Sequence, residues 1–383
     1  MSDDTRDGAQ RRGLIGNGSS TAVLPLVSSL TPTRPSPIMR PSPTMRPTRR
    51  RWLQAAAAAG FHAGLGGGVA AASNPASNPA STASGPALIA ITLDLEMSAQ
   101  YPKRGMVEWN YEKGNLDEAT KRYALEAARM VRRAGGVLHF FCVGRVLEQP
   151  DVEWLREIAA LGHPVGNHTY DHVNVKAREA VEAQFRFQRS PWLVAGKTAA
   201  EVVRENIRVT SAALESRVRI KTNGFRTPGG FHNGLEDRPD VQELLLDLGY
   251  TWVSSKYPPH PVGKPGEAPG DDVYAGIVAA QKAAQPYRYP TGLVEIPMSP
   301  ISDVTAFRSN QWKLDYFLKA IGDSVDWAIA QRAVFDFLAH PSCLVVEDPE
   351  FATIRMICDR VARAGAASAE LVGLDRIAER IRS

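Results

Sequence analysis

From residue 88 to the end of the chain, short apolar runs alternate with longer segments in which apolar residues recur every three or four positions. The short runs have the length of strands, whereas the longer segments have helical spacing and several end in glycine. The expected strands are Leu88–Leu93, Val137–Val143, Pro164–Asn167, Gly224–Thr227, Tyr250–Ser254, Leu293–Pro297, Val334–Ala339 and Leu371–Gly373. The expected helices are 116–135, 152–162, 238–249, 353–365 and 374–381. About eight strand-then-helix units predict an α/β fold, a distorted (β/α) barrel of seven or eight strands.

The first part of the chain lacks this alternation. Residues 1–47 are rich in Ser, Thr, Pro and Arg, a composition typical of disordered segments. The sequence TRRRWLQ at residues 48–54 resembles the twin-arginine export motif, and a weakly apolar run of Ala and Gly follows it. That run ends in Ala70–Ala72, a small-residue sequence suited to cleavage. We therefore expect a twin-arginine-type signal peptide.

These features divide the chain into three parts. Residues 1–72 comprise the disordered segment and the signal peptide, residues 73–85 form a low-complexity linker, and residues 86–383 form the folded domain. Signal cleavage would leave an exported protein, periplasmic or extracellular, without stable insertion in a membrane. A retained N-terminal anchor over residues 55–72 is the alternative, and Met39 or Met45 is an alternative start.

The distribution of charge argues against a nucleic-acid partner. The whole chain has a formal net charge of +4, but nine arginines and three aspartates give residues 1–72 a charge of +6. The rest of the chain, with 36 basic and 38 acidic residues, has a charge of −2. Without its first segment the protein has no basic surface that would bind a phosphate backbone.

The three cysteines show no metal-binding spacing. Cys142 lies inside the apolar run VLHFFCV and is expected in the core. A single disulfide between Cys343 and Cys358 is left as an alternative. An odd number of cysteines gives no disulfide framework.

Polar residues with useful chemistry stand directly after several expected strands. In (β/α) barrels such positions meet on one rim, where catalysis takes place. These residues are Asp94 and Glu96 after the first strand, His168 and His172 after the third, Arg226 after the fourth and His340 after the seventh. Their chemical types and their placement predict a single site.

The spacing of these residues predicts a metal centre. Residues two apart on a strand face the same side, so Asp94 and Glu96 can both face the site while Leu95 faces away. His168 and His172 are four apart and can share one metal ion if their segment turns helically. Two histidines and one carboxylate make an open metal site with room for water, and the second carboxylate can act as a base. Two solvated histidines on a helix surface are the alternative.

The ordered motifs resemble those of the polysaccharide deacetylase family, the NodB-homology domain of carbohydrate esterase family 4. The resemblance runs from about Leu88 to the end of the chain. It is carried by Thr92-Leu93-Asp94-Leu95-Glu96, His168-Thr169-Tyr170-Asp171-His172, Arg226-Thr227-Pro228-Gly229-Gly230 and Leu338-Ala339-His340, supported by FFCVG at 140–144 and LREIAALGHPVGNH at 155–168. Each motif is short, but all four occur in the family's order.

The resemblance implies a distorted barrel of the NodB-homology type and a metal-dependent hydrolysis of N-acetyl or O-acetyl groups on a polysaccharide. It implies that Asp94 is the general base, that Arg226 orients this base and that His340 is the general acid. His168 and His172 would bind a divalent metal, Zn²⁺ or alternatively Co²⁺ or another divalent ion. The implied partner is an acetylated glycan.

The chain departs from the family pattern at three places. The family's second aspartate, a metal ligand, is replaced by Leu95, which leaves Glu96 as the nearest substitute. The usual aromatic residue of the third motif is Gly229. Where many members have an acidic fourth motif, this chain has Trp252-Val253-Ser254-Ser255.

The remaining candidates divide into cleft and structural residues. Expected at the substrate cleft are Pro228, Gly229, Gly230, His232 and Trp252, although packing of Trp252 in the interior is the alternative. His139 and His163 are expected to be structural, and His260 lies in a Pro-rich loop. Glu295 ends a strand and could face the cleft or form a rim salt bridge.

Two other functions stay open. Spaced acid pairs also occur in relatives that open cyclic amides, of the allantoinase or imidase type. A non-catalytic carbohydrate-binding relative is the third hypothesis, because Leu95, Gly229 and the absent acidic fourth motif all depart from the catalytic pattern. The export motif favours a cell-envelope or extracellular glycan over a cyclic amide.

Overall fold

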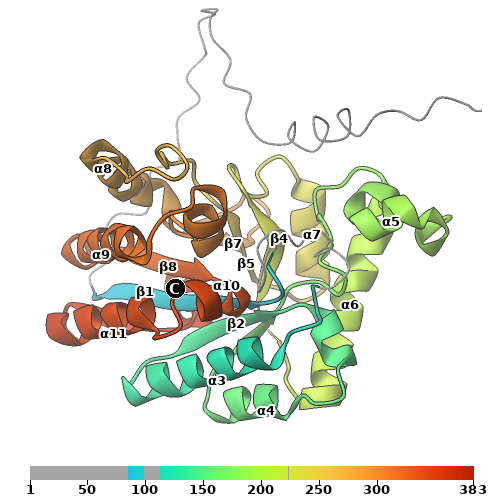
Figure 1. Ribbon diagram of the computed structural model, residues 1–383. Helices are drawn as coiled ribbons and strands as arrows, with labels where there is room; N and C mark the ends of the chain where they lie inside the picture. The colour runs from blue at the N-terminus through green and yellow to red at the C-terminus, as the bar shows by residue number, and fades with distance from the viewer. Residues whose placement is uncertain (1–84, 99–112, 223) are drawn as a thin grey trace, which may run out of the picture. The chain divides into compact units, whose positions relative to one another are not determined.

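A computed structural model describes residues 85–98, 113–222 and 224–383 of the chain (Figure 1). Within these residues nine strands form one sheet in the order β6-β7-β5-β4-β3-β2-β1-β8, and β9 pairs with the start of β1. All strand pairs are parallel except β6 with β7. The strands are β1 (Ala87–Leu95), β2 (Leu138–Cys142), β3 (Val165–Asn167), β4 (Phe225–Phe231), β5 (Trp252–Lys256), β6 (Tyr287–Arg288), β7 (Val294–Glu295), β8 (Val334–Ala339) and β9 (Ala369–Leu371).

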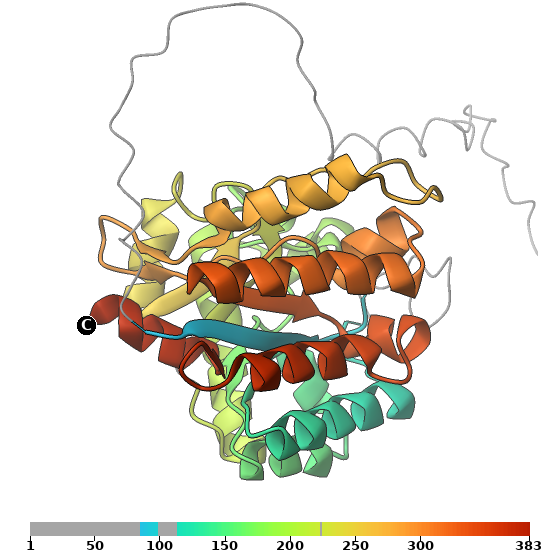
Figure 2. The same ribbon diagram turned by 90° about the vertical axis from the view of Figure 1, so that its left-hand side faces the viewer.

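Most of the helices cover the outer face of this sheet, whereas the C-terminal helix packs with Leu88 and Ala90 of its inner face. They are α3 (Glu118–Arg133), α4 (Glu153–Ala160), α5 (Phe185–Arg189), α6 (Ala199–Val218), α7 (Pro239–Asp247), α8 (Asp271–Ala280), α9 (Leu314–Gln331), α10 (Pro341–Glu347), α11 (Ala352–Ala364) and α12 (Leu374–Arg382). Figure 2 shows α8, α9, α11 and α3 side by side in front of β1, an arrangement that their mutual contacts support. Each presents an apolar stripe to the sheet and a polar face outward.

Strand β1 lies at the centre of the fold and is buried along its whole length. Its odd-numbered residues, including Ile91 and Leu95, belong to the core between the sheet and the helices. Its even-numbered residues face the inside of the barrel, where Leu88 packs against other apolar residues and Asp94 meets polar ones. Because both faces of a parallel strand are covered, β1 is apolar on both sides until it reaches the site.

The barrel closes between β8 and β7 without a regular strand ladder. Ser299, just after β7, donates its N–H to the Asp336 carbonyl at 3.0 Å, and its hydroxyl accepts the Asp336 N–H at 3.0 Å. The side chain of Gln285 likewise bonds the N–H and the carbonyl of Val334, at 2.9 and 3.0 Å. Side chains therefore supply three of these four bonds at the seam, and the predicted distorted barrel is confirmed.

The predicted elements agree with the structure except at its short or irregular parts. The five predicted helices and seven of the predicted strands are present. The eighth strand occurs earlier, as β9, and the two-residue β6 is not predicted because it is too short to show a pattern. The pattern also does not predict α5, α6, α8, α9 and α10.

Several sequence predictions fall on the N-terminal part. The signal peptide and almost the whole linker lie in residues 1–84, outside the described residues. In the described part, no helix is long and apolar enough to cross a membrane. The described residues fall within one compact unit, and their cysteines are buried and not joined in a disulfide.

Candidate metal centre and active site

A cavity of about 260 Å³ lies at the carboxyl ends of the strands. Five of the six rim residues predicted from the sequence line it, namely Asp94, Glu96, His168, His172 and His340. The sixth, Arg226, lies fully buried beneath the cavity and reaches Asp94. The structure therefore brings together side chains from β1, β4 and the segments that follow β1, β3 and β8.

Three of these side chains form a group that could hold a metal ion. One ligand atom from each of Glu96, His168 and His172 lies within 4.8 Å of the other two. Glu96 Oε2 is 2.7 Å from His172 Nε2 and 3.6 Å from His168 Nε2. The group is almost entirely shielded from solvent, with His172 the most accessible member at 13%.

The two histidines converge through a tight turn and not through the helical turn that the sequence suggests. Thr169 and His172 both have left-handed backbone conformations, with φ of 59° and 56°. The Asn167 side chain accepts the Thr169 N–H at 2.9 Å, and the Thr169 hydroxyl accepts the Val173 N–H at 3.0 Å. These local bonds hold a conformation that costs free energy for residues other than glycine.

The donor atoms fit a divalent ion. Glu96 Oε2 is buried and accepts no hydrogen bond from the described residues, because its short contact with His172 lacks hydrogen-bond geometry. His168 Nδ1 lies 2.9 Å from the Arg226 carbonyl, which can only accept, so Nδ1 carries the proton and Nε2 has a free lone pair. A carboxylate oxygen and two imidazole nitrogens are ligands that Zn²⁺ prefers.

The electrostatics of the group keep it in the ionisation state that metals bind. Burial would raise the pKa of Glu96, but the neighbouring His172 and Lys113 hold it well below its ordinary value. Burial lowers the pKa of His172 to about 4, although Glu96 opposes this effect. At neutral pH the carboxylate is therefore ionised and the imidazole of His172 is neutral.

Arg226 connects the two carboxylates that lie deepest in the barrel. It donates from Nη1 to Asp94 Oδ1 at 3.1 Å and from Nη2 to Asp336 Oδ2 at 2.5 Å. It also bonds the hydroxyls of Thr92 and Ser254. Asp94 Oδ2 stays on the cavity side, 3.7 Å from His168 Nε2. Asp336 therefore holds Arg226 in place, and Arg226 in turn holds Asp94.

His340 has a carboxylate partner that the sequence does not predict. Its Nδ1 lies 3.0 Å from Asp303 Oδ1, and its backbone N–H donates to Asp303 Oδ2 at 2.7 Å. Burial lowers the pKa of His340, but the charge of Asp303 outweighs burial and raises it above its ordinary value. Asp303 lies beyond β7 and caps the short helical segment Val304–Ser309, where it accepts the Val304 N–H at 2.8 Å; the sequence pattern predicts no element there and so gives no signal for it.

Lys113 is the second residue that sequence reasoning misses. Its ammonium contacts Glu96 Oε1, and both side chains are nearly inaccessible to solvent. It lies beyond the expected first strand and its acid pair, in a segment whose pattern predicts no element, so nothing in the sequence marks it. It brings a positive charge into direct contact with the predicted metal ligand.

The predicted cleft residues differ in where the structure places them. Gly229 and Gly230 line the cavity, and Gly229 has a φ of 76°, a conformation that favours glycine over the family's aromatic residue. Pro228 is buried and His232 is exposed, and neither is among the lining residues. Trp252 is not at the cleft: it is 1% exposed and lies in the interior.

Trp252 is interior because of its place on β5. Its ring packs edge-on against His139 and Phe141, and a Cβ at Gly224 would lie 2.1 Å from it. His139, as expected, is a core residue, and burial lowers its pKa to about 3.

His163 and Glu295 have structural roles. His163 accepts the Leu138 N–H at 3.0 Å and contacts the Ala128 carbonyl at 2.9 Å, as expected for a structural histidine. Glu295 neither faces the cleft nor forms a rim salt bridge. It is fully buried and accepts bonds from the N–H groups of Ser255 and Lys256 and from the hydroxyls of Ser255 and Tyr289.

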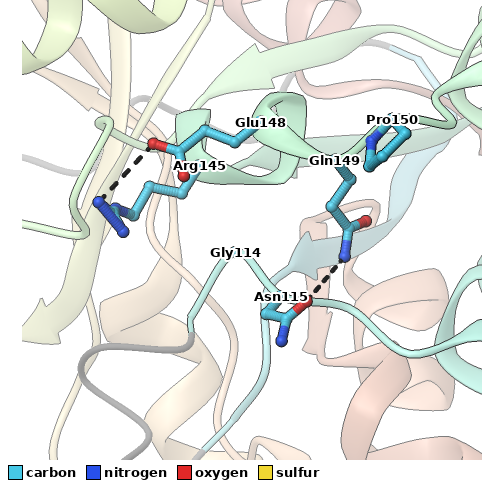
Figure 3. Close-up of a pocket in the computed structure, with 6 residues that line it drawn as sticks. All are labelled: Gly114, Asn115, Arg145, Glu148, Gln149 and Pro150. Carbon is cyan, nitrogen blue, oxygen red and sulfur yellow. Dashed lines mark hydrogen bonds and ion pairs between the residues drawn. The ribbon is translucent and has the colours of Figure 1, made fainter. Parts of the chain in front are cut away.

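Figure 3 shows a second cavity, of about 290 Å³. Its lining residues are Gly114, Asn115, Arg145, Glu148, Gln149 and Pro150. Figure 3 shows Arg145 paired with Glu148, and Gln149 bonded to Asn115 through its amide N–H, whereas Gln149 Oε1 is buried without a hydrogen-bond partner among the described residues. This cavity holds no histidine and no pair of carboxylates, and the candidate active site is therefore the first cavity.

The comparisons with known proteins agree with the fold. The family model for polysaccharide deacetylase matches residues 102–253, the region that holds both histidines and Arg226. Over this region, 152 of the 383 residues, the chain is similar to polysaccharide deacetylases, which are hydrolases. A search of curated proteins found no match.

Solved structures resemble this chain at low sequence identity. A candidate polysaccharide deacetylase from Mycobacterium smegmatis is 17% identical, with 81% of this chain and 94% of that chain covered, and its TM-score of 0.53 shows a shared fold. One from Pseudomonas aeruginosa is 13% identical, with 76% and 89% covered and a TM-score of 0.49. A family 4 pseudoenzyme from Bacillus anthracis is 13% identical, with 76% and 66% covered and a TM-score of 0.39.

Proposed function

We propose that this protein is an exported, divalent-metal-dependent hydrolase that removes N-acetyl groups from a cell-envelope or extracellular polysaccharide. The observation that carries the proposal is the buried group of Glu96, His168 and His172, with Asp94 and His340 beside it in one cavity. Two histidines and one carboxylate would hold the ion, and they leave positions open for water and substrate.

When bound, a divalent ion would polarise the acetyl carbonyl and activate water for attack. The nitrogen-rich ligand set favours Zn²⁺, with Co²⁺ as an alternative of similar coordination. Glu96 supplies the carboxylate ligand that the family draws from the position of Leu95. Among the described residues, these three form the single group of this kind.

Asp94 is suited to act as the general base. Arg226 holds its Oδ1, so its Oδ2 stays on the cavity side, where a water molecule can give up its proton. Because Arg226 and its partner Asp336 are both fully buried, the direction of the Asp94 carboxylate is set by atoms that cannot move into solvent.

His340 is suited to act as the general acid. Its Nε2 lies 3.7 Å from Glu96 Oε1, on the cavity side, and its Nδ1 is held by Asp303. The charge of Asp303 stabilises the imidazolium form, from which Nε2 can donate a proton to the leaving amine. The same arrangement would serve an O-acetyl substrate, whose leaving alcohol also needs a proton.

The proposal is tested by metal content and acetate release. The purified protein would be stripped of metal, reconstituted with Zn²⁺ and assayed on chitooligosaccharides, peptidoglycan and an acetylated exopolysaccharide. We expect about one ion per chain and release of acetate from at least one of these glycans. Cell fractionation of the producing strain, with Arg49 and Arg50 both replaced by lysine as the control, tests the export signal separately.

Other outcomes would select other functions. Full metal occupancy without acetate release from any acetylated sugar would contradict the proposal. Turnover of an allantoin-like or imide ring by the same preparation would select the cyclic-amide hydrolase. Glycan binding without metal after reconstitution would select a non-catalytic carbohydrate-binding protein.

A further inference from the structure

The two oxygens of the Glu96 carboxylate have different surroundings. Oε1 contacts the Lys113 ammonium, whereas Oε2 points to the two histidines and accepts no hydrogen bond from the described residues. Lys113 lines the same cavity as Glu96. Glu96 thus directs Oε1 toward Lys113 and Oε2 toward His168 and His172.

Lys113 is held firmly in this position. Its carbonyl accepts the Met97 N–H at 2.8 Å, which ties it to the segment directly after Glu96. The next residue, Gly114, passes so close to the helical turn at Arg145 that a Cβ there would lie 2.4 Å from the Arg145 Cβ (Figure 3). The backbone at Lys113 is therefore fixed on both sides, by the bond to Met97 and by the close packing of Gly114.

We propose that Lys113 is a positioning residue that makes Glu96 a one-oxygen ligand of the metal. This inference rests on the proposed metal site. Glutamate has one more side-chain torsion than the aspartate that the family uses, so its carboxylate can turn both oxygens toward an ion. The contact with Lys113 withholds Oε1, which leaves a coordination position for water or for the acetyl oxygen.

The proposal makes an unusual prediction about metal affinity. Without the lysine, the metal-free protein holds a buried carboxylate that has lost its main counter-ion, which raises the free energy of that form. The metal-loaded form loses a repulsion between two cations and gains a second carboxylate oxygen. Removal of Lys113 should therefore tighten metal binding while it slows catalysis.

The test compares three variants of the full chain. Lys113→Met removes the charge at nearly constant volume, and Lys113→Arg keeps a cation. Lys121→Met is the matched control, because Lys121 is similarly buried, pairs with Glu118 at 2.8 Å and does not line the cavity. Zn²⁺ affinity is measured by competition with a chelator, and the coordination number by the visible spectrum of the Co²⁺ protein, which weakens as ligands are added.

We expect the affinity of Lys113→Met for Zn²⁺ to be higher than that of the unmodified protein by about tenfold or more. We also expect a weaker Co²⁺ spectrum and slower acetate release. Lys113→Arg should retain the original spectrum, and Lys121→Met should change neither quantity. Equal or weaker metal binding by Lys113→Met, with an unchanged spectrum, would overturn the inference and leave the proposed function standing. Failure of the unmodified protein to bind any metal would overturn both.

Discussion

At the scale of single residues, the site depends on the different partners that its two carboxylates, Asp94 and Glu96, contact. Asp94 is held by Arg226, whereas Glu96 lies between Lys113 and the two histidines. The same chemical group thus receives two environments, one suited to a base and the other to a metal ligand. The division of roles follows from the neighbours of each residue.

Substitutions of Glu96 and Asp94 should therefore differ in their effects on metal binding and on catalysis. Glu96→Ala should weaken Zn²⁺ binding by about 100-fold or more, since a ligand and its charge are both lost. Asp94→Asn should keep the metal and reduce acetate release by about 100-fold or more, since the general base is lost. Metal content and single-turnover acetate release measure the two effects. If Asp94→Asn lost the metal while Glu96→Ala kept it, Asp94 would be the metal ligand and Glu96 the general base.

The Asp303–His340 pair predicts the dependence of activity on pH. Because Asp303 outweighs burial and raises the pKa of His340, the acid form of His340 persists to higher pH than for an ordinary histidine. Activity should fall as pH rises through that pKa. In Asp303→Asn the imidazolium loses its counter-ion, so the alkaline limb of kcat/KM against pH should move to lower pH. An unmoved alkaline limb would show that another group sets it.

The residues that could be predicted from the sequence are those that end a strand. Asp94, His168 and His340 are found because carboxyl ends of neighbouring strands meet on one rim. Asp303 and Lys113 could not be found, because each lies in a segment without periodicity and reaches the site through the path of the chain. The path of a loop depends on tertiary packing, and the local sequence pattern does not encode that packing.

At the scale of elements, the alternation of β1 decides which acid can act. Leu95 is fully buried in the core between sheet and helices, while Asp94 and Glu96 face the cavity. An acid at position 95 would therefore point away from the histidines. The glutamate at 96 is the first residue beyond Asp94 that the strand turns toward the site.

Restoring the family's adjacent aspartate should not restore the metal site. In the double variant Leu95→Asp with Glu96→Ala, the new carboxylate faces apolar side chains, so metal binding should stay as weak as in Glu96→Ala. Leu95→Asp alone should lower the free energy of unfolding by about 3 kcal/mol or more, because an unpaired charge is buried. Leu95→Met is the volume-matched control. Metal binding rescued in the double variant would mean that β1 has another register at its end.

At the scale of the whole folded domain, the barrel is closed by side chains where strand pairing stops. Gln285 and Ser299 supply the bonds between the β7 region and β8. The alternation of strands and helices predicts the barrel, but it does not predict this seam, because a glutamine in a loop shows no pattern. The seam also positions β8, which carries Asp336 and precedes His340.

Loss of the seam should affect stability before it affects the site. Gln285→Leu leaves the N–H and the carbonyl of Val334 without their side-chain partners, which should cost about 1–3 kcal/mol in the free energy of unfolding. Zn²⁺ affinity should stay unchanged, since Glu96 and the histidines lie on other elements. Chemical denaturation and metal titration on the same sample test both statements, and a loss of metal binding without a loss of stability would contradict them.

The central claim is that Glu96, His168 and His172 hold one metal ion. The most direct test is a crystal structure of the Zn²⁺-loaded protein, with the ion located by anomalous scattering. We predict one ion about 2 Å from Glu96 Oε2 and from both imidazole Nε2 atoms, with Asp94 nearby but not bound. An ion bound through Asp94 with Glu96 turned away, or an ion at another place, would contradict the account.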